Sequence, residues 1–213
     1  MSFSFTDIVR LQRFVLDHDR TITLSEFHDG DRDVNAFSGR HDVDHDVALH
    51  YRFALWEADQ GIRTTYFLLP TADGYSWPDE ARDYGLRMQA LGHEIGLHND
   101  AMVVCEGDVD AALDQLRAWA DEMRSWGLVV RGCADHGGAG YDNTAIWRVH
   151  NRLPSEAGLE WEAYLLHQLH TNYISDNQGE WRAPLERVPD RPTHMLVHWE
   201  HWGHLVGADP VTL

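Results

Sequence analysis

Lysine is absent from this sequence of 213 residues, and all 17 of its basic residues are arginine. Without lysine the chain can form no lysine Schiff base and can supply no P-loop lysine. The 35 acidic residues give a net charge of −18, and phosphate backbones or anionic membranes instead require clustered cations. We therefore expect neither a nucleic acid nor a membrane as a partner.

Cysteine and long apolar runs are also scarce. The two cysteines, Cys105 and Cys133, form no CxxC or zinc-knuckle spacing and suit a reducing compartment. The sequence contains no run of about 18 apolar residues that would predict a transmembrane helix. The first residues, MSFSFTDIVRLQRF, contain no apolar segment typical of a signal peptide. These features predict a cytoplasmic protein with one domain over residues 1–213.

Helical and strand-like patterns alternate along the chain. Helical spacing of apolar residues predicts helices, and β-branched or aromatic runs predict strands. The expected helices are 6–19, 46–60, 78–91 and 108–126. The expected strands are a short one at the end of 34–44, then 63–69, 93–98, 129–135, 162–167, 171–176 and 193–199. This order predicts an α/β domain whose parallel sheet is covered by helices, either open or closed into a barrel.

Ionisable side chains gather at the carboxyl ends of these strands, where α/β folds build active sites. They are Asp42 and Asp44, His98, His136, Asp176 and His198. Asp42 and Asp44 share one strand face, and two such carboxylates repel each other unless a cation or a proton separates them. A divalent metal on one aspartate, with the other left as a base, would explain the pair. A helix cap is the alternative.

Two histidines extend the metal interpretation. In GHEIGLH, His98 stands at the end of a strand as a candidate ligand, whereas His93 lies on the opposite face and is expected in a structural hydrogen bond. In MLVHWEHW, His198 follows an apolar strand. A carboxylate such as Asp176 could tune His198 as a general acid.

The segments RHDVD, TTYFLL, GHEIGLH, DHG, YISDNQGEWR and LVHWEHW occur in this order between residues 35 and 202. Together they resemble the polysaccharide-deacetylase (NodB-like) superfamily, carbohydrate esterase family 4, and a short intracellular branch of it in particular. The resemblance implies a distorted (β/α) barrel of about seven parallel strands. It also implies one divalent metal, usually zinc, with nickel, cobalt or iron as alternatives. By position, Asp42 becomes the general base, Asp44 a metal ligand and His198 the general acid.

The sequence departs from the family pattern at the third metal ligand. The family's second histidine ligand follows the first by four residues, and Met102 stands there. His136 is the preferred substitute, with Asp100 and His93 as alternatives. The resemblance therefore predicts a metal site made of Asp44, His98 and one of these three residues.

The activity implied by the resemblance is amide hydrolysis. The metal polarises an acetamide carbonyl and holds a water, Asp42 removes a proton from that water, and His198 protonates the leaving amine. The family's Arg-Pro motif is not recognisable, so Arg40 or Arg182 is expected to orient the base. A small soluble N-acetylated sugar or sugar-containing metabolite fits a chain without an export signal.

Aromatic residues near the motifs are candidates for stacking on sugar rings. They are Trp77, Tyr141, Trp181, Trp199 and Trp202. Three other functions compete. Hydrolysis of a ring amide or ureide needs nearly the same chemistry, and a metal-free carbohydrate-binding pseudoenzyme would not need both Asp42 and Asp44. An amidohydrolase is disfavoured, because the sequence contains no His-x-His pair.

Overall fold

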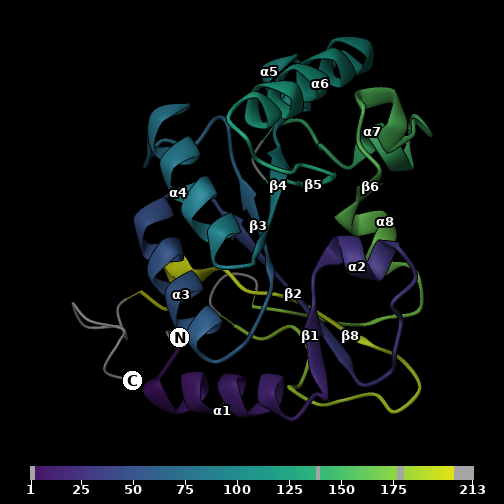
Figure 1. Ribbon diagram of the computed structural model, residues 1–213. Helices are drawn as coiled ribbons and strands as arrows, with labels where there is room; N and C mark the ends of the chain where they lie inside the picture. The colour runs from purple at the N-terminus through teal and green to yellow at the C-terminus, as the bar shows by residue number, and fades with distance from the viewer. Residues whose placement is uncertain (1–2, 138–139, 177–179, 204–213) are drawn as a thin grey trace.

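The computed structural model describes residues 3–137, 140–176 and 180–203. Its strands form one parallel sheet in the order β6-β5-β4-β3-β2-β8-β7, and β1 pairs with the first residues of β2. The sheet curls into a half-barrel (Figure 1), which is not closed because the end strands β6 and β7 do not pair with each other within the described residues. The strands are β1 (Arg20–Ile22), β2 (Ala36–Val43), β3 (Thr65–Leu68), β4 (Glu94–Asn99), β5 (Gly132–Asp135), β6 (Trp161–Glu162), β7 (Asn172–Ser175) and β8 (Thr193–Leu196).

Helices surround the curled sheet (Figure 1). They are α1 (Phe5–Leu16), α2 (Leu24–His28), α3 (Val47–Asp59), α4 (Asp79–Ala90), α5 (Ala101–Val104), α6 (Val109–Ser125), α7 (Ala145–Arg148) and α8 (Ala163–His167), with 3₁₀ turns η1 (Pro154–Ala157) and η3 (Trp199–His201). No described helix combines the length and the apolar character needed to cross a bilayer. The expected α/β fold, a distorted barrel of about seven parallel strands, is confirmed.

Strand β2 is the centre of the sheet and is longer than the sequence predicts. The pattern over residues 34–44 predicts a loop leading into a short strand, but Ala36–Val43 is one strand that is buried along its whole length. Its upstream half pairs with β1 and its downstream half with β3, while β8 covers the other edge. Polar residues of this segment are satisfied by that pairing; Ser38 Oγ, for example, donates to the Thr193 carbonyl at 3.2 Å.

Two further predictions about local structure are wrong. The pattern over residues 162–167 predicts a strand, but β6 ends at Glu162 and α8 follows at once. The Glu162 carboxylate accepts hydrogen bonds from the backbone N–H groups of Tyr164 and Leu165, which caps the new helix. Helix α1 begins one residue earlier than expected, with Ser4 as its N-cap.

A small apolar cluster fills the amino end of the half-barrel. It contains Ile22, Leu24, Phe27, Ala36, Phe67, Ala134, Trp161, Ala163 and Leu166. A Cβ atom at Gly96 would overlap the Phe67 ring, and one at Gly132 would overlap the Trp161 ring, so both glycines make room for this cluster. The main core lies in a separate, larger cluster. This cluster fills part of the interior of the half-barrel with apolar side chains.

Candidate active site

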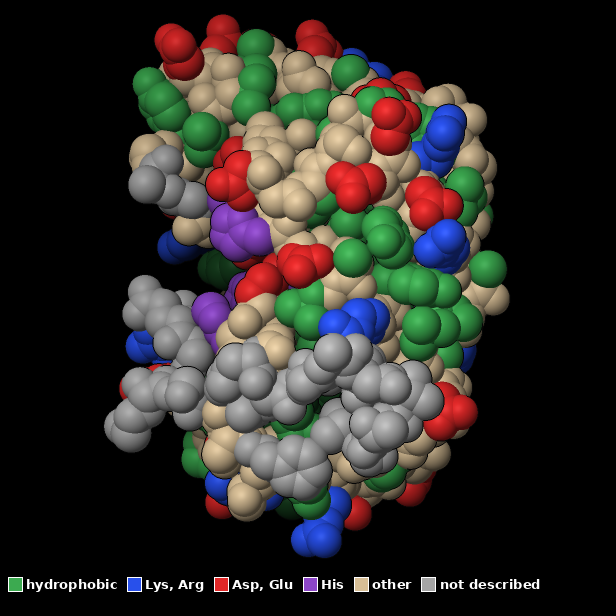
Figure 2. Space-filling view, turned by 90° about the vertical axis from the view of Figure 1, so that its left-hand side faces the viewer, with side chains coloured by type: hydrophobic (Ala, Val, Ile, Leu, Met, Phe, Trp, Pro, Cys, Tyr) green, Lys and Arg blue, Asp and Glu red, His purple; other side chains and the backbone are tan. Residues whose placement is uncertain are grey.

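A cavity of about 640 Å³ lies at the carboxyl ends of the strands. In Figure 2 it appears as a hollow with histidine and carboxylate side chains beside it. The sequence-predicted residues that line it are Arg40, Asp42, Asp44, His98, His136, Arg182 and His198. The fold thus brings together side chains from β2 and β4 and from the segments that follow β2, β5, β7 and β8.

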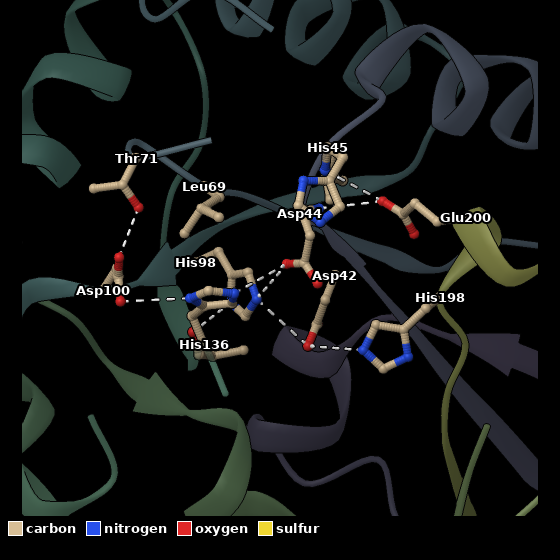
Figure 3. Close-up of polar contacts among 12 residues, drawn as sticks. Asp42, Asp44, His45, Leu69, Thr71, His98, Asp100, His136, His198 and Glu200 are labelled. Atoms are coloured by element: carbon tan, nitrogen blue, oxygen red, sulfur yellow. Dashed lines mark hydrogen bonds and ion pairs between the residues drawn. The ribbon is translucent and has the colours of Figure 1, made fainter. Parts of the chain in front are cut away.

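Asp44 and His98 face each other in this cavity (Figure 3). The Nδ1 atom of His98 donates to the Ala134 carbonyl at 2.8 Å, so its Nε2 atom points to Asp44 Oδ1 at 3.1 Å and to Asp42 Oδ2 at 3.6 Å. Burial would lower the pKa of His98, but the two carboxylates outweigh it and raise the pKa. The two carboxylates therefore favour a positive charge at the Nε2 atom, which either a proton or a metal ion can provide.

His136, the preferred third ligand, stands on the other side of Asp44. Its Nε2 atom lies 3.9 Å from Asp44 Oδ1, and its Nδ1 atom lies 3.4 Å from Asp100 Oδ1. Asp100 is held in place by Thr71, whose hydroxyl donates to Oδ2 at 2.8 Å (Figure 3). The Asn143 side-chain amide also donates to Asp100, at 3.2 Å. Asp100 therefore sits behind the imidazole, where it can orient His136 toward Asp44.

The other substitutes for the missing ligand lie elsewhere. His93 is on the far side of the sheet, where its Nε2 atom donates to the Ala54 carbonyl at 2.9 Å, as expected for a structural histidine. Met102 is buried in α5, and its backbone N–H donates to Asn143 Oδ1 at 3.0 Å. Neither side chain contacts Asp44 among the described contacts.

Asp44 offers an atom suited to a metal. Its Oδ1 atom is buried and has no hydrogen-bond partner among the described residues, although two imidazole Nε2 atoms face it. Carboxylate oxygen and imidazole nitrogen are zinc ligands, and ligand atoms around a tetrahedral zinc lie roughly 3.3 Å apart. The 3.1 Å distance to His98 fits that spacing, and the 3.9 Å distance to His136 is slightly wide. The atom types of Asp44, His98 and His136 thus suit a divalent metal, and the Asp44–His98 pair has the right spacing. The three ligand atoms do not all lie within 4.8 Å of one another, so His136 would have to move toward His98 to bind the same ion.

A second group of possible ligand atoms lies at the surface. Among the described residues, only His28, Asp29 and Glu160 place three such atoms all within 4.8 Å of one another. Both Asp29 oxygens already accept from the Arg131 guanidinium, at 2.8 and 2.9 Å, and Glu160 also pairs with it at 2.5 Å. Both carboxylates of this group are thus already engaged by the one guanidinium of Arg131, in an exposed ion-pair network.

Asp42, the predicted base, is bound by Arg40. The guanidinium donates to Oδ1 at 3.1 Å and to Oδ2 at 2.6 Å, and both side chains are buried. Burial would raise the pKa of Asp42, but Arg40 and then His98 and His198 lower it. Of the two arginines proposed to orient the base, Arg40 makes this contact, and Arg182 does not.

His198, the predicted acid, is held by Asp176. The Asp176 carboxylate accepts from the His198 backbone N–H at 3.0 Å and faces its Nδ1 atom at 2.8 Å. The Trp202 indole also donates to Asp176 at 2.9 Å. Burial would lower the pKa of His198, but Asp176 and then Asp42 raise it to about 9. The Nε2 atom points into the cavity, 4.0 Å from Asp42 Oδ2.

Glu200 is a cavity residue that the sequence motifs do not single out. Its Oε1 atom accepts hydrogen bonds from the backbone N–H groups of Asp44 at 3.3 Å and His45 at 3.4 Å (Figure 3). Its Oε2 atom lies 3.4 Å from the buried His50 Nε2 atom. Its position two residues after His198 is the signal that could have found it. Glu200 thereby holds the turn that presents Asp44.

Asp135, also missed by the motifs, lines the cavity beside His136. It accepts from Asn99 Nδ2 at 2.5 Å and from the Trp147 indole at 2.9 Å. Burial raises the pKa of Asp135 to about 6, although both hydrogen bonds oppose that change. Its place directly before His136, at a strand end, is the corresponding signal in the sequence.

The expectation that Trp199 and its neighbours stack on a substrate ring is wrong for Trp199. Its ring is 2% exposed and stacks on Phe53 at 3.9 Å and on His41 at 4.9 Å, behind β2. Trp202 is fully buried against Phe3. Of the five candidate aromatic residues, none lines the described cavity.

Comparison with known proteins adds no assignment. A scan against protein-family models found none that matches this sequence, and no curated protein matches it. The resemblance to polysaccharide deacetylases therefore rests on the motifs and their order.

Proposed function

We propose that the protein is a metal-dependent hydrolase that removes an N-acetyl group from a small N-acetylated sugar or sugar-containing metabolite in the cytoplasm. The observation that supports this most is the buried Asp44 Oδ1 atom, which has no hydrogen-bond partner among the described residues and faces two imidazoles. A base candidate, Asp42, and an acid candidate, His198, stand beside it. Both cysteines are free, in keeping with a reducing compartment.

The proposed ligands are Asp44, His98 and His136. Zinc is the preferred metal because its usual ligands include carboxylate and imidazole, and when bound it would polarise the amide carbonyl. Asp100 would keep the Nδ1 proton of His136 in place, so that the Nε2 lone pair stays available. The Ala134 carbonyl does the same for His98.

Asp42 and His198 divide the proton transfers. Arg40 keeps Asp42 ionised, so its Oδ2 atom can accept a proton from the attacking water. The Nδ1 proton of His198 is committed to Asp176, so the Nε2 proton is the one to be donated to the departing amine nitrogen. The two groups lie 4.0 Å apart, which lets one water-sized reactant contact both.

Hydrolysis of a ring amide or ureide remains the second candidate, and a metal-free carbohydrate-binding protein the third. The absence of the five candidate aromatic residues from the described cavity wall argues against the third, since such modules bind sugar rings by stacking. The first two candidates differ in their products. Deacetylation releases acetate and a free amine, whereas ring opening releases neither acetate nor any second molecule.

The test combines metal content with product. Purified protein should contain about one equivalent of divalent metal by elemental analysis, as expected for a mononuclear hydrolase. It should release acetate from at least one member of a panel of N-acetylated amino sugars. Asp44→Ala should lose the metal, whereas Asp114→Ala, at an exposed aspartate of α6, should keep it. Full metal occupancy in Asp44→Ala would refute the ligand assignment.

A further inference from the structure

The carboxylate and guanidinium groups that line the cavity have protein partners, with one exception among the described residues. Asp42 is paired with Arg40, and Asp44 faces His98 and His136 as a proposed metal ligand. The other two carboxylates, Asp135 and Glu200, accept hydrogen bonds from side-chain amide and indole groups or from backbone N–H groups. The remaining charge is that of Arg182.

Arg182 is anchored by its backbone and free at its side chain. Its backbone N–H donates to the Ser175 carbonyl at 2.8 Å, which fixes the residue beside the end of β7. The residue is exposed and lines the cavity. Its guanidinium has no hydrogen bond or ion pair with any described residue. Most other arginines of the described chain bind a carboxylate, a carbonyl or an aromatic ring, so this open guanidinium is unusual for the molecule.

The rest of the cavity wall offers little else for binding a neutral ring. Among the described lining residues, Leu196 is the one aliphatic side chain, and Tyr173 is the one tyrosine or tryptophan. A ligand here must be recognised through hydrogen bonds and charge. With a net charge of −18, the protein as a whole repels anions. An anionic ligand would therefore need a local cation.

We infer that Arg182 binds an oxyanion of the substrate, either a carboxylate or a phosphate, and that the natural substrate is an anionic N-acetylated compound. This inference rests on the proposed function and narrows its substrate class. A guanidinium presents parallel N–H donors that match both oxyanions in a bidentate way. The oxyanion of the substrate would thus supply the negative charge that no described protein group places beside the Arg182 guanidinium.

Three N-acetylated probes test this with zinc-loaded protein: neutral N-acetylglucosamine, its 6-phosphate, and N-acetylmuramic acid, which carries a carboxylate. We expect wild-type protein to prefer one anionic probe in kcat/KM, mainly through a lower KM. Arg182→Gln should reduce kcat/KM for that probe about 10- to 100-fold, the usual loss for a hydrogen-bonded charged contact, and leave the neutral probe unchanged. The preferred anion identifies the oxyanion as phosphate or carboxylate.

Two further variants serve as controls. Arg182→Lys should recover part of the preference, because it restores the charge without the bidentate geometry. Arg10→Gln removes the same charge from exposed α1, outside the cavity, and should leave all three probes unchanged. An equal loss on neutral and anionic probes in Arg182→Gln, or no preference in wild type, would overturn the inference.

A binding measurement separates this inference from the proposed function. The thermal midpoint of the zinc-loaded protein is measured with each probe. If no probe releases acetate, deacetylation of these compounds fails. The inference still stands if an anionic probe alone raises the midpoint in wild type and not in Arg182→Gln. Equal midpoints with neutral and anionic probes in wild type would refute it.

Discussion

The polar side chains on the two sides of strand β2 differ in whether the protein supplies partners for all of their hydrogen-bonding atoms. On the cavity side, Asp42 is followed by Asp44, whose buried Oδ1 atom lacks a hydrogen-bond partner among the described residues. On the other side, His41 donates through Nδ1 to the Val197 carbonyl at 3.1 Å and through Nε2 to Glu57 at 2.8 Å. Three residues along the chain therefore separate the closed group, His41, from the open one, Asp44, which lies just after the strand.

Glu57 completes the closed side. Its carboxylate also accepts from the hydroxyls of Thr64 at 2.8 Å and Tyr66 at 2.7 Å. Burial would raise the pKa of Glu57, but His41 and then His93 and Tyr66 lower it. Every strong donor in this network ends on a protein acceptor, so it has no capacity left for a ligand.

The comparison shows how a buried polar cluster that stabilises the fold can be distinguished from one that binds a ligand. A buried charge is costly unless it is paired and hydrogen-bonded. Where the protein supplies all partners, as around Glu57, the cluster stabilises the fold. Where a lone pair such as Asp44 Oδ1 is left open toward other ligand atoms, the missing partner comes from outside the chain. Variants on the two faces should therefore fail in different ways.

The largest effect is expected for Asp42→Asn on the cavity side. Loss of the general base should reduce acetate release by about 10²–10⁴. The asparagine carbonyl can still accept from Arg40, so the fold and the metal should both remain. Turnover, metal content and circular dichroism measure these three properties. Normal turnover would place the base elsewhere, and loss of metal would make Asp42 a ligand.

Glu57→Gln should act on stability instead. Breaking a buried pair while leaving His41 in place should lower the free energy of unfolding by roughly 3 kcal/mol. Urea denaturation measures this change, and metal content should stay the same. Glu106→Gln, at an exposed residue, is the matched control with no expected change.

The Glu57 carboxyl group should also make the stability of the protein depend on pH in acid. Because the folded pKa of Glu57 lies below its ordinary value, its stabilisation is present above the unfolded pKa and disappears as pH falls through the folded pKa. The stability difference between wild type and Glu57→Gln should therefore shrink in acid. A difference that stays constant with pH would show that Glu57 acts through shape alone.

Asp100→Asn should have a smaller effect, on metal affinity. Asp100 lies behind His136 and orients it, so the weaker acceptor should cost about 10-fold in affinity, the low end for groups that orient a metal ligand. Competition with a chelating dye measures this change. His136→Ala should cost far more. An equal and complete loss of metal in Asp100→Asn would make Asp100 a ligand itself.

The smallest expected effect is a displacement of the pH profile in Asp176→Asn. Because His198 must be protonated to act, the rate should fall as pH rises through its pKa of about 9. Removing the Asp176 charge should move this alkaline limb down, toward the ordinary histidine value of about 6.5. Rate profiles of the two proteins test the shift. If the alkaline limb does not move, it does not report the titration of the His198–Asp176 pair.

Local pattern is enough to predict the order of the main strands and the ionisable groups at their ends. Strand alternation depends only on neighbouring residues, so the sequence alone places Asp42 and Asp44 on one side of their strand and His93 opposite His98. Local pattern could not predict the helix after Glu162, because a short apolar run of six residues is compatible with a strand or a helix.

Tertiary structure alone decided which groups meet across space. The choice of Arg40 over Arg182 as the partner of Asp42, the place of Asp100 behind His136, and the contact of Glu200 with the Asp44 turn all depend on how the sheet curls. The curl also turned Trp199 away from the cavity. These contacts join residues that lie far apart in the sequence. Local periodicity cannot predict them, because it carries no information on how close two strand ends lie in space. The sequence determined which chemical groups are present, and the packing of the sheet determined which of them remained without a partner.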